Sequence, residues 1–190
     1  INDNDKPKRD LLKVIPMTGW EREWYFDKTG LKWVNPSPNI RSLTAAILYP
    51  GMCLLEGTNI SEGRGTHTPF EICGAPWMDG EELLKEMRSL KLKGVDYERT
   101  VFTPTSRKFK GERCEGLQFI ITDRSLFKPY LTGLALIYTV AMMYPKDFKW
   151  RREPYEFVTD IPAIDLLTGD GTFRKLVDKK RPFEDIAKLA

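Results

Sequence analysis

The stretch from Pro50 to Asp79 constrains this chain more than any other, because it is both strongly polar and rich in glycine. Its glycines permit backbone angles that are closed to other residues. Short apolar runs occupy residues 52–55 and 70–73, and we interpret them as strands that anchor a bent loop. A segment this polar and this bent is not expected to belong to the core.

Within this loop, Arg64 stands between Gly63 and Gly65. A guanidinium presented from a tight turn suits a carboxylate or phosphate, because its donors pair two oxygens at once. The other interpretation is a solvated arginine in a glycine-rich surface loop, since short motifs often match by chance.

The chain has 190 residues, which is enough for one sizeable domain. Hydrophobic residues make up 41% and charged residues 30%, as in ordinary globular proteins, so we do not expect disorder. We predict that residues 1–9 are a frayed end or linker and that residues 10–190 form a single α/β domain. Because the chain begins at Ile1, we expect it to be a fragment or a processed product.

Charge and cysteine content argue against several kinds of site. The net charge of +3 comes from 30 basic and 27 acidic residues that are interspersed, whereas a nucleic-acid-binding surface would show clustered Lys and Arg. Cys53, Cys73 and Cys114 form no CxxC pair, and with one histidine we expect no metal site and no cofactor. A disulfide between Cys53 and Cys73 stays open. The longest apolar run, residues 131–144, is too short to cross a bilayer.

Periodicity and capping signals predict a mixed α/β fold with a short mixed sheet and flanking helices. Ser42 is expected to cap a helix that Pro50 stops. Asp79 is expected to cap a second helix that ends at Gly94. Strands are expected over residues 101–105 and 116–122, an apolar helix over 129–144, and short helices from Thr172 and Phe183.

Several short motifs, taken together, resemble one protein family. They are PSPN at 36–39, YPG at 49–51, CLLEGTNISEGRGT at 53–66, PFEICGAPW at 69–77, TDR at 122–124, TGLALI at 132–137 and IDLLTGD at 164–170. The family is that of the NamZ exo-β-N-acetylmuramidases, formerly described as a domain of unknown function. The resemblance runs from about Leu12 to Asp170, and residues 56–71 carry its most specific part.

This resemblance implies a bacterial glycoside hydrolase of cell-wall turnover and recycling. Its substrates would be peptidoglycan fragments such as MurNAc-GlcNAc, from whose non-reducing end it removes N-acetylmuramic acid (MurNAc). The family has a Rossmann-like N-terminal domain, a smaller C-terminal α/β domain that this chain matches, and an active site in the cleft between them. The family's N-terminal Pro-Glu-His-Gly stretch, which holds a favoured catalytic glutamate, is absent from this sequence, and we expect the N-terminal domain to be missing here. We therefore do not expect the chain to hydrolyse substrate without that domain as partner, and we expect an extracytoplasmic location, periplasmic or secreted.

The resemblance and the residue types together predict a site in the loop within residues 50–79, which we call the central loop. Glycoside hydrolysis normally needs two carboxyl groups, and Glu62 is the predicted catalytic residue. A simple ion pair between Glu62 and Arg64 is the alternative. Arg64 is predicted to bind the lactyl carboxylate that distinguishes MurNAc from N-acetylglucosamine (GlcNAc). Further substrate contacts are expected from Asn39, Asn59, Ser61, Thr66, Glu56 and Glu71.

Two other functions stay open. The first is a non-catalytic module that binds peptidoglycan sugars without turnover. The second is an anion-binding or nucleic-acid-binding domain that uses Arg64 and a basic patch within residues 107–113, and its binding would depend steeply on salt. A solvated hairpin turn is the preferred interpretation of residues 107–113. His67 stands where the sequence departs from the family's pattern, so we expect no catalytic role for it.

Overall fold

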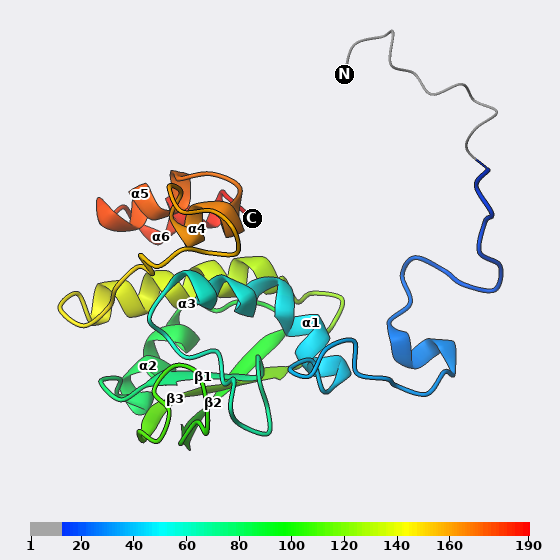
Figure 1. Ribbon diagram of the computed structural model, residues 1–190, viewed down its shortest axis with the longest axis horizontal. Coiled ribbons are helices and arrows are strands. Elements are labelled where there is room, and N and C mark those ends of the chain that lie inside the picture. Colours follow the sequence, from blue (N-terminus) through cyan, green and yellow to red (C-terminus); the bar gives the residue numbers. More distant parts are fainter. Residues whose placement is uncertain (1–12) are drawn as a thin grey trace, which may run out of the picture. The chain divides into compact units, whose positions relative to one another are not determined.

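The structure is a computed structural model that describes residues 13–190, and its contacts divide the chain into two units, residues 1–33 and residues 34–190 (Figure 1). The linker predicted over residues 1–9 lies outside the described residues. The proposed division into a linker and one domain therefore stays a prediction.

The described part of the first unit contains one short 3-10 helix, η3 (Phe26–Thr29). Gly30 ends it in a left-handed conformation with φ 70°. The rings of Phe26 and Trp33 meet edge to face with centroids 5.2 Å apart, an arrangement that aromatic pairs prefer.

The first α-helix of the second unit is α1 (Leu43–Met52), whose N-cap is Ser42 as predicted. The Ser42 hydroxyl accepts a hydrogen bond from the Ala45 backbone N–H at 2.9 Å, as an N-cap does. Pro50 does not stop the helix, which continues to Met52 and into the 3-10 helix η4 (Cys53–Gly57). The strand predicted over residues 52–55 is therefore wrong, because a short apolar run fits a buried helical turn as well as a strand.

A three-stranded antiparallel sheet in the order β1-β3-β2 forms one side of this unit. Its strands are β1 (Ile72–Ala75), β2 (Val95–Phe102) and β3 (Cys114–Ile121). The strand predicted over residues 116–122 is confirmed. The strand predicted over 101–105 is misplaced, because β2 begins at Val95 and ends at Phe102.

Helix α2 (Gly80–Ser89) packs on β2 and β3 through Leu83 and Met87, both fully buried. The Asp79 carboxylate caps it by accepting from the N–H groups of the two following glutamates at 2.9 and 3.1 Å. The helix ends at Ser89 and not at Gly94, so the predicted start is confirmed and the predicted end is too late.

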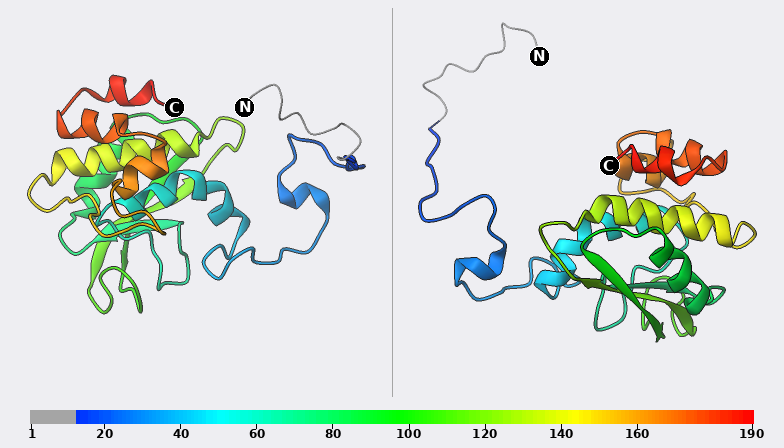
Figure 2. Two further views of the ribbon diagram at one scale, coloured as in Figure 1. Left: turned by 45° about the horizontal axis from the view of Figure 1, so that its top comes forward. Right: turned by 180° about the vertical axis from the view of Figure 1, so that it is seen from behind.

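Helix α3 (Pro129–Met143) lies between the sheet and a group of short C-terminal helices (Figures 1 and 2). These are α4 (Ala163–Thr168), α5 (Thr172–Asp178) and α6 (Phe183–Ala187). The three predicted helix starts at 129, 172 and 183 are confirmed. The mixed α/β architecture with a small sheet and flanking helices is thus confirmed. The predicted mixed sheet is wrong in one respect, because both strand pairings are antiparallel. Within residues 13–190 no helix is long and apolar enough to cross a membrane.

Candidate functional site

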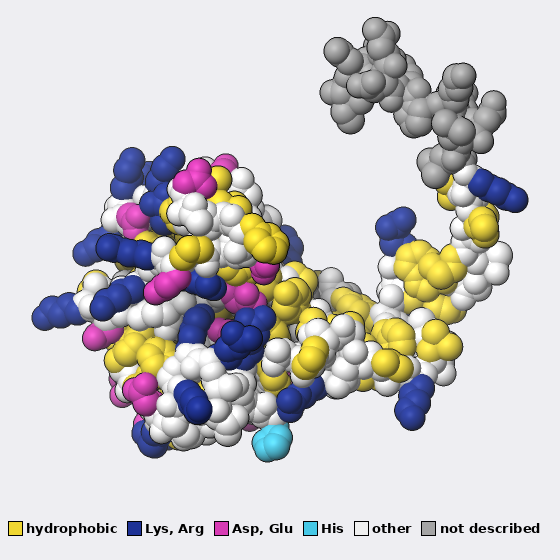
Figure 3. All heavy atoms as spheres, viewed as in Figure 1, with side chains coloured by type: hydrophobic (Ala, Val, Ile, Leu, Met, Phe, Trp, Pro, Cys, Tyr) yellow, Lys and Arg dark blue, Asp and Glu magenta, His cyan; other side chains and the backbone are white. Residues whose placement is uncertain are grey.

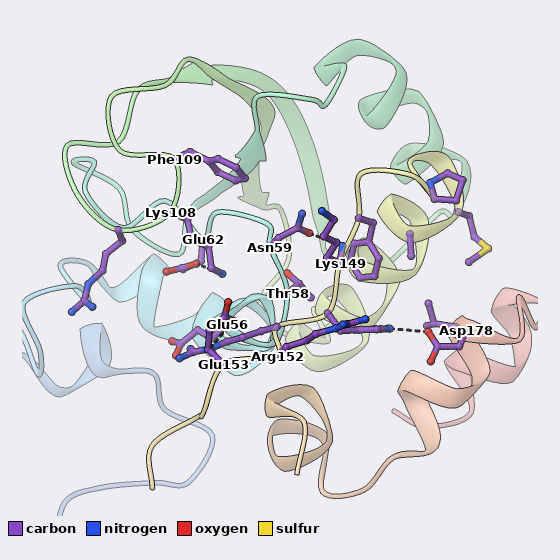
Figure 4. A pocket seen from close by; sticks show the side chains of 18 of the residues that line it. Glu56, Thr58, Asn59, Glu62, Lys108, Phe109, Lys149, Arg152, Glu153 and Asp178 are labelled. Atoms are coloured by element: carbon purple, nitrogen blue, oxygen red, sulfur yellow. Dashed lines mark hydrogen bonds and ion pairs between the residues drawn. The ribbon is translucent and has the colours of Figure 1, made fainter. Parts of the chain in front are cut away.

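A pocket of about 1070 Å³ opens in the second unit, where four segments that are distant in the sequence meet (Figure 4). Its walls come from residues 56–64, from the loop at 107–109, from the end of α3 with residues 148–153, and from the end of α5. Residues 148–153 have no regular helix or strand. One wall of the pocket is therefore formed by an irregular loop that contains residues 148–153.

Four charged side chains at one end of this pocket form a connected cluster of two carboxylates and two cations. The cluster consists of Glu56, Glu62, Arg64 and Lys108, and we call it the carboxylate–cation cluster. Glu56 is 8% exposed and Glu62 2% exposed. Charges buried to this degree are found in proteins only when they are paired.

Glu62 is held at both oxygens. Lys108 Nζ lies 3.0 Å from Glu62 Oε2, and Arg64 Nη1 lies 3.4 Å from Glu62 Oε1. The Glu62 backbone carbonyl also accepts a hydrogen bond from the Phe70 N–H at 2.8 Å. The Glu62 side chain is thus fixed both by the fold of its loop and by ion pairs.

Arg64 is folded onto the carboxylates instead of extending freely from its turn. Its Nη2 lies 2.8 Å from Glu56 Oε1, and its guanidinium carbon lies 5.0 Å from the centroid of the Phe70 ring. The side chain is 25% exposed, and its buried Nε has no hydrogen-bond partner. The predicted alternative, an ion pair between Glu62 and Arg64, is therefore present, and it extends to Glu56.

The second oxygen of Glu56 is bound by a residue from a distant loop. The Tyr155 hydroxyl donates to Glu56 Oε2 at 3.1 Å. Burial raises the pKa of Tyr155, and the nearby Glu56 carboxylate raises it further. Tyr155 therefore remains a hydrogen-bond donor through the neutral pH range.

Lys108 points inward from the loop that joins β2 to β3. Its ammonium donates to the backbone carbonyls of Leu55 and Ile60 at 2.9 and 2.8 Å as well as to Glu62. Burial lowers the pKa of Lys108, and the Glu62 carboxylate opposes this shift. In Figure 4, Lys108 and Glu62 lie beside each other in the pocket wall.

The rest of the pocket is aromatic and mainly cationic. Phe148 and Trp150 meet edge to face at 4.9 Å, and Trp150 Nε1 donates to Asp178 Oδ1 at 2.8 Å. Seven Lys and Arg residues line the pocket against four Asp and Glu residues. Figure 3 shows Lys and Arg side chains gathered on one face of the second unit, with Asp and Glu among them. Such a lining favours an anionic ligand.

The pocket brings together four of the eight residues predicted from the sequence, namely Glu56, Asn59, Glu62 and Arg64. Asn59 is fixed by the backbone of the facing loop, because its amide donates to the Asp147 carbonyl and accepts from the Lys149 N–H, each at 2.9 Å.

The other four predicted residues lie outside the pocket lining and make local contacts. Ser61 Oγ accepts from the Gly63 N–H, and Thr66 Oγ1 donates to the Gly63 carbonyl. The Glu71 carboxylate accepts from the Ser42 hydroxyl at the start of α1. The backbone N–H of the fourth, Asn39, donates to Ser37 Oγ in a turn. The substrate-binding roles assigned to all eight residues stay predictions.

The sequence indicates Lys108 only as part of the alternative basic patch within residues 107–113, and it indicates no role for Tyr155. Lys108 lies in a stretch interpreted as a solvated hairpin turn, and nothing in its neighbouring residues distinguishes it from exposed Lys110. Tyr155 belongs to an irregular aromatic segment, which marks the region but not the residue. His67 is exposed and lies outside the pocket lining. Among residues 13–190, no group of three His, Cys, Asp or Glu side chains is placed to hold a metal ion.

Comparison with known proteins gives two family matches. Residues 47–190 match the model of the C-terminal part of the exo-β-N-acetylmuramidase NamZ, and residues 1–44 match the model of its N-terminal part. The peptidoglycan β-N-acetylmuramidase NamZ of Bacillus subtilis (strain 168) is 41% identical over 175 residues, which are 92% of this chain and 40% of that protein.

Two solved structures from Bacteroides fragilis, both DUF1343 family proteins, are similar in fold. One has a TM-score of 0.79 and 26% identity, over 90% of this chain and 44% of its own length. The other has a TM-score of 0.52 and 25% identity, over 81% of this chain and 38% of its own length. The chain thus spans less than half the length of the relatives that it matches.

Proposed function

The chain belongs to the NamZ family of exo-β-N-acetylmuramidases, and from this membership we propose that it forms the carbohydrate-active C-terminal part of a glycoside hydrolase. The enzyme releases MurNAc from the non-reducing end of peptidoglycan fragments. The observation that carries this proposal is the carboxylate–cation cluster, which places Glu56 and Glu62 in the wall of a large, net-cationic pocket.

Glu62 is the carboxylate that this chain contributes to the chemistry. Hydrolysis of a glycosidic bond uses one carboxyl group to protonate the leaving oxygen and a second that acts as an anion, on water or on the anomeric centre. With an ammonium on one oxygen and a guanidinium near the other, Glu62 is suited to the anionic role. The proton donor is then a carboxyl group of the N-terminal domain.

Arg64 recognises the lactyl carboxylate of MurNAc. A guanidinium has five N–H donors, and the two carboxylates of the cluster accept from only two of its nitrogens. The remaining donors of Arg64 can form a charged hydrogen bond with the lactyl carboxylate of MurNAc, and GlcNAc, which lacks that carboxylate, cannot form it. The same site therefore selects MurNAc over GlcNAc.

The N-terminal domain of the same protein completes the cleft. The match of residues 1–44 to the family's N-terminal model supports this arrangement. Because the substrate is cell-wall peptidoglycan, we place the protein outside the cytoplasm, in the periplasm or in the medium.

The test is release of MurNAc from the disaccharide MurNAc-β-1,4-GlcNAc by the full-length gene product. We expect Glu62→Gln to lower kcat by about 100-fold or more, the usual scale for loss of a group that acts in proton transfer. Glu112→Gln is the matched control, because Glu112 is exposed and outside the pocket lining, and it should retain the parent rate. A folded parent that binds MurNAc without turnover would instead indicate a sugar-binding module.

A further inference from the structure

Lys108 uses every N–H of its ammonium inside the protein. An ammonium has three donors, and the three acceptors are Leu55 O at 2.9 Å, Ile60 O at 2.8 Å and Glu62 Oε2 at 3.0 Å. Two of these acceptors belong to the backbone on either side of Glu56. Lys108 therefore fixes the segment that carries both carboxylates of the cluster and has no donor left for substrate.

The loop that carries Lys108 is strained on both sides of it. Arg107 has φ 66° and Phe109 has φ 56°, both in the left-handed region. Residues other than glycine occupy this region at a free-energy cost and persist there only when the surrounding contacts demand it. The contacts that require it here are those of the inward-pointing Lys108.

The same loop is also attached beside Arg64. Thr105 donates to the Gly65 carbonyl through its backbone N–H at 2.9 Å and through its hydroxyl at 2.8 Å. A Cβ at Gly65 would lie 2.7 Å from the Ser106 backbone nitrogen, so the two loops are in direct backbone contact. The β2–β3 loop is thus joined to the central loop both before Arg64, at Ile60 and Glu62, and after it, at Gly65.

We propose that Lys108 is a positioning residue of this hydrolase: it holds the Glu62 carboxylate, and through it the Arg64 guanidinium, in the geometry that the reaction needs. This inference rests on the proposed function. Glu62 is 2% exposed, and removal of one partner from a buried ion pair leaves an uncompensated charge. Without Lys108, Glu62 turns toward Arg64 or toward solvent, and both groups leave their working positions.

The experiment compares variants of the full-length gene product in release of MurNAc from MurNAc-β-1,4-GlcNAc, with melting temperatures measured in parallel. We expect Lys108→Met to lower kcat at least about tenfold with a smaller change in KM, as for an interaction that matters in the transition state. Lys110→Met is the matched control, because Lys110 is exposed on the same loop, and it should keep the parent kcat. Lys108→Arg keeps the charge but not the tetrahedral donor geometry, so its kcat should fall between those of the parent and Lys108→Met.

A double variant separates positioning from a general structural role. If Lys108 acts through Glu62, then Glu62→Gln with Lys108→Met should lose no more activity than Glu62→Gln alone, within about threefold. If the double variant instead loses activity by the product of the two single-variant losses, the proposal is overturned. A folded Lys108→Met with the parent kcat would also overturn it. Should Lys108→Met not fold, a parent-like kcat in Lys108→Arg would overturn it instead.

The experiment also distinguishes failure of the proposed hydrolase function from failure of the positioning role of Lys108. If the folded parent releases no MurNAc, the proposed function fails, and calorimetric binding of MurNAc by the same variants then tests the positioning role. Weaker binding by Lys108→Met than by Lys110→Met would uphold it, and equal binding would overturn it. A parent that neither releases nor binds MurNAc would overturn both.

Discussion

Phe70 adopts a backbone conformation that is rare for phenylalanine, with φ 65°. Its N–H bonds the Glu62 carbonyl, its ring lies under the Arg64 guanidinium, and it meets Tyr49 edge to face at 4.9 Å. Strained residues often occur at functional sites, where the surrounding contacts hold them. The contacts that hold Phe70 in this conformation therefore also help to orient Glu62 and Arg64.

The buried thiol of Cys73 makes the free energy of unfolding depend on pH. Complete burial raises the pKa of its thiol from 9.0 to about 12. Above pH 9 the unfolded chain loses this proton while the folded protein keeps it, so the contribution of the thiol to stability is complete below pH 9 and is lost as the pH rises toward 12. We expect the difference in free energy of unfolding between the parent and Cys73→Ala to be constant from pH 6 to 8 and to fall above pH 9. Urea unfolding with a reductant present measures it, and a difference that stays constant to pH 11 would contradict the assignment.

At the scale of elements, the crossing of α1 and α3 explains why α1 continues past Pro50. Gly51 and Gly133 face each other across this crossing, and a Cβ at Gly51 would lie 1.9 Å from the Pro129 carbonyl oxygen. Contact this close buries the last turn of α1, and such packing outweighs the hydrogen bond that proline removes. The expectation that a helix ends at proline is based on local sequence, and it cannot account for this contact between two helices.

Gly51→Ala tests the crossing. Alanine normally stabilises a helix relative to glycine, but here its methyl group meets backbone, so we expect a loss of at least about 2 kcal/mol in unfolding free energy, the usual scale of overpacking. Gly111→Ala is the control, because nothing lies within 4 Å of a Cβ there, and only its left-handed φ costs about 1 kcal/mol. Equal losses in the two variants would show that the crossing is not tightly packed.

The missed start of β2 has a physical reason as well. The first residues of β2 alternate between apolar side chains that face the core, Val95 and Tyr97, and charged ones that face solvent, Asp96 and Glu98. Asp and Glu have low β propensity, so the composition of this stretch does not favour a strand, and Asp96 pairs with Arg88 of α2 at 2.9 Å. Pairing with β3 along the whole strand, which local sequence does not reveal, determines its length.

For the whole molecule, local patterns predicted the elements better than they predicted the site. Helix caps such as Ser42 and Asp79 are encoded within three residues, and the structure confirms them. Glu62 and Arg64 could be singled out because they share one short loop. Lys108 and Tyr155 could not, because they lie 46 and 99 residues from the carboxylates that they bind, and only the tertiary fold brings them together.

The proposed role of Arg64 in the carboxylate–cation cluster is to recognise the carboxylate of MurNAc. Isothermal titration of the full-length protein with MurNAc and with GlcNAc tests it directly, and Arg113→Ala is the matched control because Arg113 pairs with Glu115 outside the pocket lining. We expect the parent and Arg113→Ala to bind MurNAc at least about tenfold more tightly than GlcNAc, the scale of a charged hydrogen bond, and Arg64→Ala to bind the two sugars equally. A preference for MurNAc that survives in Arg64→Ala would contradict it.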